Sequence, residues 1–528
     1  MPTLKQQSLS SKMNSPQQDL ISDRIRLAFL TCCMLASNLI TNANCFAQTA
    51  NDYFGIQVVD KQTGRGVPLV RLRTTGAIDL WSDSNGWIAF NEPGLMDTSV
   101  YFSVESPGYS YPADGFGYRG VQLQTTPGKT AKIELNRDQL AQRLYRITGQ
   151  GIYRDSQLLN QPYPTEVQQL SAGVIGQDSV QMVRFKDKLY WLWGDTILPN
   201  YPLGNFHTTA AITDSEQLKK LDPSRSLDFQ YIVGNNGFPK KMLSVQDPGV
   251  VWLFGLIDVT DSDRDEYLVA HYSRHLELGK TVEHGIAVWD ESKQQFEKRT
   301  TFDLSNKWRF PRGQAVRVQQ EDDDYIYFTE SFATVRVRAH LEYILDPDHY
   351  QSLAWDSDKQ AYIWQKQRPP TTQKEEAVLL ASGSMPASHA RHQLRDIAND
   401  NPVEIHRSSI YWNAYRRKWI MIGCQLDERN KPSHLGEIWY SEASAVDGPW
   451  YKVVKVATHP SYTFYNPRHH QLLDRENGQI IYFEGTYTHQ FSGNESQTPR
   501  YDYNQLLYRL DLSQLPDAEQ FETVLFKR

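Results

Sequence analysis

The fold is indicated most clearly by one segment, Leu189-Tyr190-Trp191-Leu192-Trp193-Gly194-Asp195-Thr196. Its aromatic and apolar residues follow one another without a polar break, which predicts a strand buried on both faces. The strand ends abruptly in a Gly-Asp-Thr turn, so a polar side chain is placed at the end of a sheet. Similar strands recur downstream at Val250–Gly255, Tyr325–Glu330, Trp419–Cys424 and Ile480–Gly485.

Each of these apolar strands belongs to a larger repeated unit. A first segment precedes the strand, and a loop with a third strand follows it. The first segments are Gly176–Val180, Val245–Gly249, Pro311–Ala315, Glu404–Ser408 and Tyr465–His469, and third strands include Thr208–Ile212, Gly285–Trp289 and Glu437–Ser441. Five antiparallel units spaced by roughly 60 to 95 residues are typical of a five-bladed β-propeller with large insertions. We expect this propeller at residues 148–515.

Short alternating strands separated by turns occupy residues 52–136 and predict a small β-sandwich. In the turn Ser82–Gly86, Asp83 and Asn85 favour a hairpin over a calcium loop, because further acidic residues at suitable spacing are lacking. A polar, helix-prone connector near Arg137 to Arg146 joins the two parts. The predicted fold class is therefore all-β, with a small N-terminal β-sandwich followed by a five-bladed β-propeller.

Residues 1–47 have the pattern of a signal peptide. Arg24 and Arg26 precede the apolar stretch Leu27–Ile40, and Cys45-Phe46-Ala47 supplies small residues for cleavage. The apolar stretch is shorter than the roughly 20 residues that span a bilayer, so we expect no transmembrane segment in the mature chain and a secreted or periplasmic location. Cys424 is the one cysteine beyond this leader, so no intrachain disulfide is expected.

Composition narrows the possible partners. The net charge of -7 argues against a nucleic-acid partner. Aromatic residues make up 12% of the chain, with 13 Trp and 29 Tyr, and this density suits carbohydrate binding. No phosphate-binding loop, dinucleotide fingerprint, serine-hydrolase elbow or zinc pattern is found. No cofactor is therefore required, although a structural calcium or other ion at the propeller axis remains open, as does the oligomeric state.

The geometry of a propeller blade predicts which residues of the repeats lie close together. If the first strand of each blade descends along the axis and the second returns, the start of one and the end of the other share a face. Acidic side chains from separate blades then converge on one funnel. The catalytic candidates are Asp178, Asp195, Asp247, Glu330, Glu437 and Glu484. The substrate-binding candidates are Trp193, His207, Arg312, His406, Tyr465, Asn466, Arg468 and His469.

Glycosidic bond cleavage needs a carboxylic acid to protonate the leaving oxygen and a carboxylate to activate water or attack the anomeric carbon. Asp178 with Asp195 is the pair that we favour. Structural roles compete with this interpretation: Asp195 can cap a turn and Asp247 can end a strand. Glu330 and Glu484 can pair with arginines, and His469 can be a buried structural histidine.

Two resemblances support the assignment. The motif Asp60…Thr63-Gly64…Pro68…Val70 and the turn Ser82–Gly86 resemble carboxypeptidase-regulatory or transthyretin-like modules of secreted proteins, which are accessory domains. Residues from about 170 to 515 resemble secreted five-bladed glycoside hydrolases of the arabinanase and β-xylosidase clan and D-arabinan-cleaving relatives. That second resemblance rests on Trp193–Thr196, Asp247-Pro248, Tyr440–Trp450, Tyr465–His470 and Ile481–Thr488.

The clan resemblance implies roles for particular residues. It implies a base at Asp178, on the first blade, and a residue that tunes acidity at Asp247, on the second. The third blade opens with Arg312 and Gln314 where the clan has an acidic Glu, so the acid would come from Glu330, Glu437 or Glu484. The resemblance thus implies a secreted glycoside hydrolase without specifying its sugar or linkage.

Two other functions remain compatible with the sequence. A non-catalytic carbohydrate-binding propeller is favoured if Arg or Lys neutralises each carboxylate of the funnel. A scaffold or adhesion protein is favoured if the funnel lacks clustered acids and the N-terminal domain is the active part.

Overall fold

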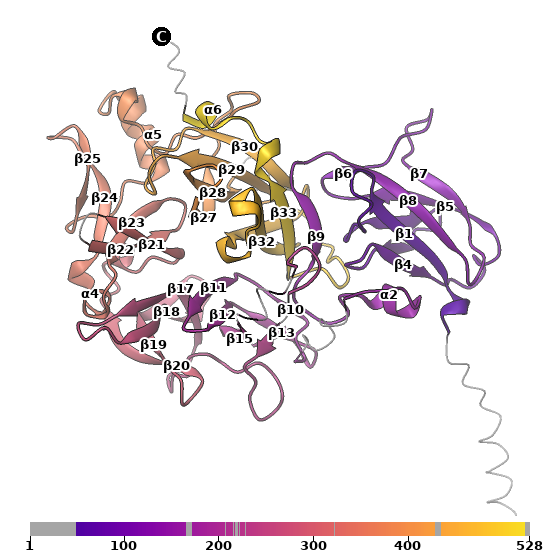
Figure 1. Ribbon diagram of the computed structural model, residues 1–528, viewed down its shortest axis with the longest axis horizontal. Helices are drawn as coiled ribbons and strands as arrows, with labels where there is room; N and C mark the ends of the chain where they lie inside the picture. The colour runs from indigo at the N-terminus through magenta and orange to yellow at the C-terminus, as the bar shows by residue number, and fades with distance from the viewer. Residues whose placement is uncertain are drawn as a thin grey trace, which may run out of the picture. The chain divides into compact units, whose positions relative to one another are not determined.

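Figure 1 shows the computed structural model, which describes residues 49–522 apart from 165–171, 206, 215, 217–219, 221, 228, 321–322 and 428–434. Strands predominate and helices are short, so the predicted all-β class is confirmed. The predicted leader, residues 1–47, lies outside the described residues and stays a prediction. Within the described ranges, no helix has the length and apolar character needed to cross a membrane.

Two four-stranded sheets form from residues 54–137 and share one hydrophobic core. Val100, Phe102 and Val104 alternate with more exposed residues along β5 and pack with Ile56 and Ile133 of the other sheet. The sheets have the orders β4(Trp87–Phe90)-β1(Phe54–Asp60)-β8(Thr130–Arg137)-β6(Tyr109–Ser110) and β3(Asp79–Trp81)-β2(Arg71–Thr74)-β5(Ser99–Glu105)-β7(Gly120–Gln124).

A turn at residues 82–86 leads from β3 to β4, and because these strands belong to different sheets it is not the hairpin that the sequence predicts. Asp83 Oδ1 accepts the N–H groups of Asn85 and Trp87 at 2.9 and 3.0 Å, which is the local side-chain bonding that favours aspartate in turns. Its second oxygen accepts the N–H of Ser156 at 2.6 Å. Both oxygens of Asp83 are therefore occupied by the protein itself.

Five larger sheets and one small sheet follow. The small sheet is β10(Gly176–Gln177)-β13(Thr196–Leu198)-β14(Tyr201–Asn205). The five larger sheets are β11(Gln181–Phe185)-β12(Lys188–Trp193)-β15(Thr209–Asp214)-β16(Gln230–Tyr231), β17(Val250–Thr260)-β18(Glu266–Glu277)-β19(Lys280–Asp290)-β20(Gln295–Phe302), β21(Gln314–Gln320)-β22(Asp323–Thr329)-β23(Ala333–Arg338)-β24(Gln351–Asp356)-β25(Ala361–Gln365), β26(Arg395–Asp396)-β30(Lys452–Thr458)-β29(Glu437–Ala443)-β28(Lys418–Gln425)-β27(Ile405–Asn413) and β31(Thr463–His469)-β32(Ile480–Thr488)-β33(Asn504–Asp511)-β9(Gln142–Arg146). The α-helices in the described residues are α2(Arg154–Leu158), α4(Leu341–Leu345), α5(Gln373–Ala381) and α6(Ala518–Glu522).

The first strands of the five larger sheets contact one another in succession. β11 lies against β17, β17 against β21, β21 against β27, and β27 against β31. Arg468 of β31 then donates from Nη2 to the carbonyl of Met182 in β11 at 2.5 Å, which closes the cycle. Residues at the starts of these strands are thereby brought together although they are far apart in the chain.

The segment near Arg137 to Arg146 corrects one prediction. It contains the strand β9, not a helix, and β9 pairs with β33 from the end of the chain, where Figure 1 shows purple beside yellow. Arg143 is fully buried and donates to the carbonyls of Pro68 and Pro107 and to Ser106 Oγ. Tertiary pairing thus overrides the local helix propensity of the segment.

The second repeated unit also differs from the prediction. Val250–Gly255 was expected to be the second strand of its unit, but it begins β17, which is the first strand of its sheet. Both β17 and the following β18 are long and partly buried, so an apolar run alone does not show which strand lies innermost. Asp247 still precedes the first strand, as expected.

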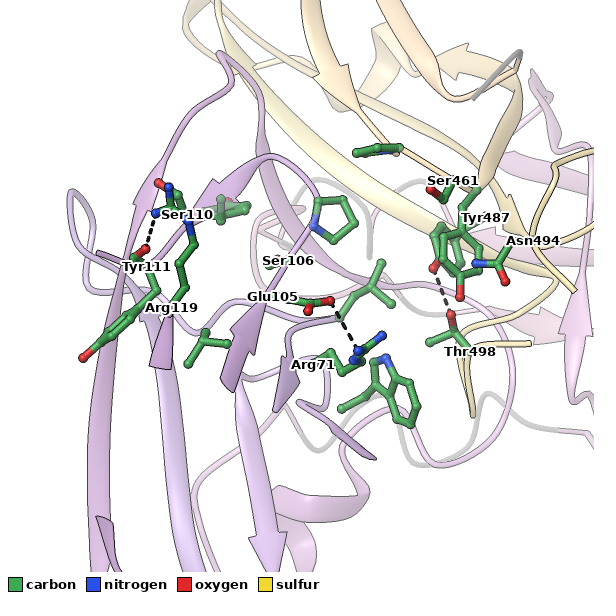
Figure 2. Close-up of a pocket in the computed structure, with 17 residues that line it drawn as sticks. Arg71, Glu105, Ser106, Ser110, Tyr111, Arg119, Ser461, Tyr487, Asn494 and Thr498 are labelled. Atoms are coloured by element: carbon green, nitrogen blue, oxygen red, sulfur yellow. Dashed lines mark hydrogen bonds and ion pairs between the residues drawn. The ribbon is translucent and has the colours of Figure 1, made fainter. Parts of the chain in front are cut away.

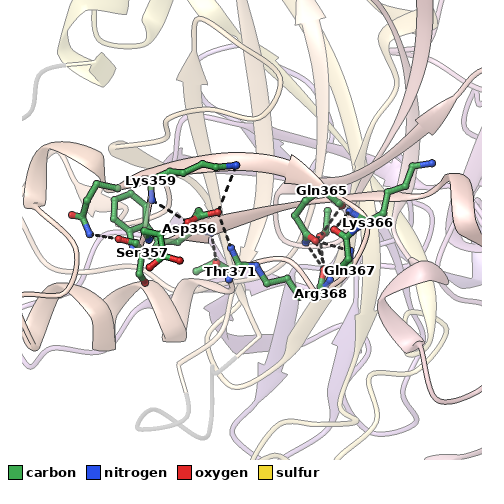
Figure 3. Close-up of polar contacts among 12 residues, drawn as sticks. Asp356, Ser357, Lys359, Gln365, Lys366, Gln367, Arg368 and Thr371 are labelled. Carbon is green, nitrogen blue, oxygen red and sulfur yellow. Dashed lines mark hydrogen bonds and ion pairs between the residues drawn. The ribbon is translucent and has the colours of Figure 1, made fainter.

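The insertion between the third and fourth units does not wall the central cavity described below. Its strands β24 and β25 extend their sheet at the edge away from β21. Figure 3 shows the polar contacts of this hairpin, in which Asp356 Oδ1 accepts the N–H groups of Asp358 and Lys359 at 3.0 Å. No described residue of the insertion lines that cavity.

Candidate active site

Asp178 and Asp195 come together at the ends of neighbouring strands. Asp178 lies in the turn between β10 and β11, and Asp195 follows β12. The N–H of Gly194 donates to the carbonyl of Asp178 at 2.8 Å, and the N–H of Asp195 donates to Asp178 Oδ1 at 2.7 Å. The spacing in sequence therefore predicted a pair that the local backbone does hold together.

Three aromatic side chains surround the two carboxylates and donate hydrogen bonds to them. The Tyr465 hydroxyl donates to Asp178 Oδ2 at 2.7 Å. The indole N–H of Trp252 donates to Asp195 Oδ1 at 2.7 Å, and the Tyr503 hydroxyl donates to Asp195 Oδ2 at 3.5 Å. The pair is thus enclosed by groups that donate hydrogen bonds without carrying charge.

Burial raises the pKa of both carboxyl groups. The pKa of Asp195 rises to about 7, first because of desolvation and second because of the negative charge of Asp178. Desolvation also raises the pKa of Asp178, while the hydrogen bonds from Tyr465 and the Asp195 N–H oppose the rise. The largest causes of both shifts are burial, the neighbouring carboxylate and uncharged hydrogen-bond donors, and no Lys or Arg is among them. Ionisation of one carboxyl group thus disfavours ionisation of the other, because two adjacent carboxylates do not both ionise readily.

Gly194 leaves the space that the Asp178 carboxylate occupies. A Cβ atom at this position would lie 2.3 Å from Asp178 Oδ1, which is closer than any real contact. The Gly-Asp-Thr turn therefore does more than end a strand: its glycine admits one carboxylate and its aspartate supplies the other.

A small cavity of about 70 Å³ lies beside the pair. Ser179 and Asn466, which directly follow Asp178 and Tyr465 in the chain, line this cavity and are joined by a hydrogen bond of 2.7 Å. All five larger sheets, with the turns that lead into them, contribute to its wall. The lining residues are Ser179, Gln181, Phe254, Arg312, Gly313, Gln314, Thr329, Arg407, Ser408, Asn466 and Pro467.

A continuous set of contacts runs from the acidic pair to Arg312. The ring of Trp252 lies 4.3 Å from that of His275, centroid to centroid. His275 Nδ1 is 3.2 Å from Thr281 Oγ1, and Arg312 Nη2 donates to the same oxygen at 3.0 Å. Arg312 is thereby oriented at the cavity by residues of the neighbouring sheet.

Glu330 differs from the acidic pair because it has basic partners. Its Oε1 accepts the N–H of Arg312 at 2.6 Å and lies 3.3 Å from Arg407 Nη1. Burial alone would raise the pKa of Glu330, but Arg407 and the Arg312 N–H outweigh it and lower that pKa. Glu330 is therefore an ionised carboxylate near neutral pH.

Two further acidic candidates, Asp247 and Glu437, each have a basic neighbour. The Asp247 side chain is 70% exposed and lies 4.0 Å from Arg274 Nη2. Glu437 is 2.9 Å from Lys455 Nζ and accepts from the Thr458 hydroxyl at 2.9 Å. Each of the two is thus compensated by a basic residue of its own sheet.

Glu484 is buried and bonded to a histidine. Its Oε1 lies 2.6 Å from His470 Nε2. Desolvation raises the pKa of Glu484 to about 8 in spite of Arg468, and desolvation lowers the pKa of His470 well below its ordinary value. We therefore describe this as a neutral pair in which the carboxylic acid donates to the imidazole.

Three of the predicted binding residues lie in the interior. Trp193 is 1% exposed and packs against Trp191 and Phe229. Arg468 is buried and donates to Gln314 Oε1 beneath the cavity. His469 is buried and bonds to Asp474 at 2.9 Å.

The other predicted binding residues lie on or near the pair and the cavity. Tyr465, Asn466 and Arg312 are described above. His207 Nδ1 accepts the N–H of Val251 at 3.2 Å, next to Trp252, and burial lowers the pKa of His207 to about 4. The carbonyl of His406 accepts from the Ser331 hydroxyl at 2.8 Å, beside Glu330 in the chain.

Sequence reasoning missed three residues of this site. Trp252 lies in an apolar strand and was interpreted as core, Tyr503 lies outside the repeated motifs, and Arg407 reaches Glu330 from another sheet. A signal for Trp252 was present, since it follows the Asp247-Pro248 turn by only a few residues. Nothing in the sequence pointed to Tyr503, and the expectation that Glu330 can pair with an arginine did not single out Arg407.

A metal site is not evident in the described ranges. They contain no group of three or more His, Cys, Asp or Glu side chains arranged to hold a metal ion. The structural ion considered for the axis stays untested by this observation.

A larger cavity of about 550 Å³ lies between the first two sheets and the segments 460–462 and 487–498. Figure 2 shows that Glu105, its one acidic lining residue, points to Arg71, at 3.5 Å. The cavity thus lacks a second carboxylate for acid and base catalysis.

No family model matches the chain, and no curated protein matches it. Solved structures that it resembles include an exo-β-1,3-galactanase from Phanerochaete chrysosporium with galactose, at 11% identity and a TM-score of 0.33, covering 64% of this chain and 61% of that one. An α-L-arabinofuranosidase from Fusarium graminearum with an iminosugar inhibitor matches at 10% identity and a TM-score of 0.32, covering 64% and 94%. An exo-1,5-α-L-arabinanase from a bovine ruminal metagenomic library gives the same four values. These likenesses are remote, so the function is inferred below from the residues of this chain.

Proposed function

We propose that the chain is a secreted glycoside hydrolase that cleaves a polysaccharide or oligosaccharide with the Asp178 and Asp195 pair. In this proposal residues 1–47 direct export, residues 52–136 are an accessory β-sandwich, and residues 148–515 form a five-bladed β-propeller. The cyclic contacts of the five first strands and the pairing of β9 with β33 support the propeller. The core shared by the first two sheets supports the sandwich.

The observation that carries the proposal is the state of the acidic pair. Asp195, with its pKa raised to about 7, holds a proton that it can donate to the leaving oxygen. Asp178 accepts two hydrogen bonds of 2.7 Å, which favour its ionised form as the carboxylate that activates water or attacks the anomeric carbon. One acid and one carboxylate, held at one place, are the two groups that glycosidic cleavage requires.

A binding protein without catalysis is the second candidate. It predicts that a basic residue neutralises each carboxylate of the funnel, and this is the case for Glu330, Glu437 and Asp247. The Asp178 and Asp195 pair does not follow that pattern, since only uncharged donors contact it in the described chain. The catalytic proposal is therefore preferred.

The test is a screen of the wild-type protein against plant, algal and bacterial polysaccharides, beside Asp178→Asn and Asp258→Asn. Asp258 is a matched control, because it is a half-exposed aspartate with its own partner, Arg317, at 3.1 Å. We expect Asp178→Asn to reduce sugar release by about 10²- to 10⁴-fold and Asp258→Asn to retain it. Equal release by wild type and Asp178→Asn would reject Asp178 as catalytic.

A further inference from the structure

The cavity beside the acidic pair has an unusual charge for a neutral sugar site. Arg312 and Arg407 both line it, and Glu330 accepts the backbone N–H of Arg312 and pairs with the guanidinium of Arg407. One ionised carboxylate, that of Glu330, is therefore set against the two guanidinium groups of Arg312 and Arg407. These three side chains together carry one excess positive charge, and the cavity that the two arginines line is also lined by Ser179, which follows Asp178 in the chain.

The size of the cavity limits what it can hold. Ligand pockets for whole small molecules measure roughly 300 to 1,000 Å³, whereas this cavity measures about 70 Å³. It is too small for a sugar ring and large enough for a substituent of one. Its floor is polar, because the Gln314 side chain lines it and is itself held by Arg468.

The geometry points to a subsite in which Arg312 and Arg407 bind the carboxylate of a uronic acid residue while the sugar ring lies over Asp178 and Asp195. This inference rests on the proposed function and names its substrate class, an acidic glycan. A guanidinium presents parallel N–H donors that match a planar carboxylate, so arginine is the suitable residue at such a position. Arg312 is already oriented by Thr281, and Arg407 by Glu330.

Binding is measured separately from hydrolysis, so that the two proposals can fail independently. Calorimetry with sodium glucuronate, sodium galacturonate, glucose and sodium sulfate is carried out on the wild type and on Asp178→Asn. We expect both proteins to bind one of the uronates, and neither to bind glucose or sulfate comparably. Sulfate binding as tight as the tighter uronate would overturn the carboxylate assignment, as would equal binding of uronates and glucose.

Three arginine variants locate the subsite. Arg407→Met is expected to weaken uronate binding by about 10- to 100-fold, the effect of losing hydrogen bonds to a charged group. Arg317→Met is the matched control, since Arg317 is 32% exposed, against 28% for Arg407, and is also ion-paired. Arg407→Lys, which keeps the charge without the planar fork, is expected to bind with intermediate strength and guards against a variant that fails to fold. Equal loss in Arg407→Met and Arg317→Met overturns the proposal.

Hydrolysis supplies the second measurement. Uronic-acid polysaccharides are compared with the same polymers after reduction of their carboxyl groups to alcohols. We expect the wild type to have a KM at least 10-fold lower on the acidic polymer, and Arg407→Met to lose that preference. If uronates bind but no polymer is cleaved, the subsite proposal stands and the hydrolase proposal is wrong. If only neutral polymers are cleaved and no uronate binds, the hydrolase proposal stands and the subsite proposal is wrong.

Discussion

Two pairs of side chains invite comparison: Asp178 with Asp195, and Glu484 with His470. In each pair burial raises the pKa of a carboxyl group, to about 7 at Asp195 and to about 8 at Glu484. Their surroundings differ. Glu484 is fully buried beside one histidine, whose ring lies 5.3 Å from that of Trp191. Asp195 is half-buried and has a second carboxylate, Asp178, as its neighbour, and the residue that follows Asp178 lines a cavity. A raised pKa by itself indicates burial of the carboxyl group. It indicates a catalytic group only where solvent or substrate can also reach the carboxyl and a second carboxylate lies beside it.

The largest expected effect separates the two pairs by activity. Asp195→Asn removes the proposed proton donor, so we expect kcat on the best substrate to fall by about 10²- to 10⁴-fold. Glu484→Gln keeps a neutral donor toward His470 Nε2, so we expect its activity to stay within about 10-fold of wild type. Steady-state kinetics of the two variants measures this, and a larger loss in Glu484→Gln than in Asp195→Asn would reverse the comparison.

The second effect concerns the position of Asp178. Gly194→Ala places a methyl group 2.3 Å from the present position of Asp178 Oδ1 and must displace that carboxylate. We expect activity to fall by about 10²-fold, the effect of a misplacement of about 1 Å. Gly115→Ala is the control, because no atom lies within 4 Å of its added Cβ. Full activity in Gly194→Ala would show that the position of Asp178 is unimportant.

The third effect is the pH dependence of stability. The pKa of Glu484 is raised from 4.5 in the unfolded chain to about 8 in the folded protein. The folded state therefore binds more protons, and this contribution to stability is complete below pH 4.5 and is lost as the pH rises to about 8. We expect the free energy of unfolding to fall by about 1 kcal/mol per pH unit in this range.

Urea unfolding at several pH values measures that slope in wild type and Glu484→Gln. The variant should lose most of the slope, because its amide does not titrate. Asp195→Asn should remove a similar contribution between pH 3.8 and about 7, where the same sign applies. An unchanged slope in both variants would mean that neither carboxyl group is protonated in the folded state.

A smaller effect tests the hydrogen bond from Trp252 to Asp195. This bond favours the ionised carboxylate, so its loss in Trp252→Phe should raise the pKa of Asp195 further. We expect the alkaline limb of the activity profile to move to higher pH by about 0.5 to 1 unit. Trp412→Phe, an exposed tryptophan, serves as control. A shift to lower pH would contradict the assignment of Asp195 as the acid.

The smallest effect concerns Asp247, to which the clan resemblance gives a role in tuning acidity. Because its side chain is 70% exposed and lies 4.0 Å from Arg274, we expect Asp247→Asn to change kcat/KM by less than about 3-fold. A loss comparable with that of Asp178→Asn would favour the role that the resemblance implies.

The sequence predicted those parts of the molecule that local pattern controls. The apolar strands and the Gly-Asp-Thr turn were found from residue type alone, and the turn led to Asp195. Two features escaped because they depend on distant pairing. β9 is a strand only through β33, and the arginine that pairs with Glu330 is decided by packing, which brings Arg407 to it from another sheet. Burial was also beyond the pattern, since Trp193 was expected at a binding surface and lies in the core.

The most direct test of the account is a carbon-13 titration of the aspartate carboxyl groups in the wild type and in Asp195→Asn. The account predicts one aspartate carboxyl in the wild type with a midpoint near pH 7 that is missing in the variant. A wild-type protein in which every aspartate carboxyl has finished titrating below about pH 5, as ordinary aspartates do, would contradict it.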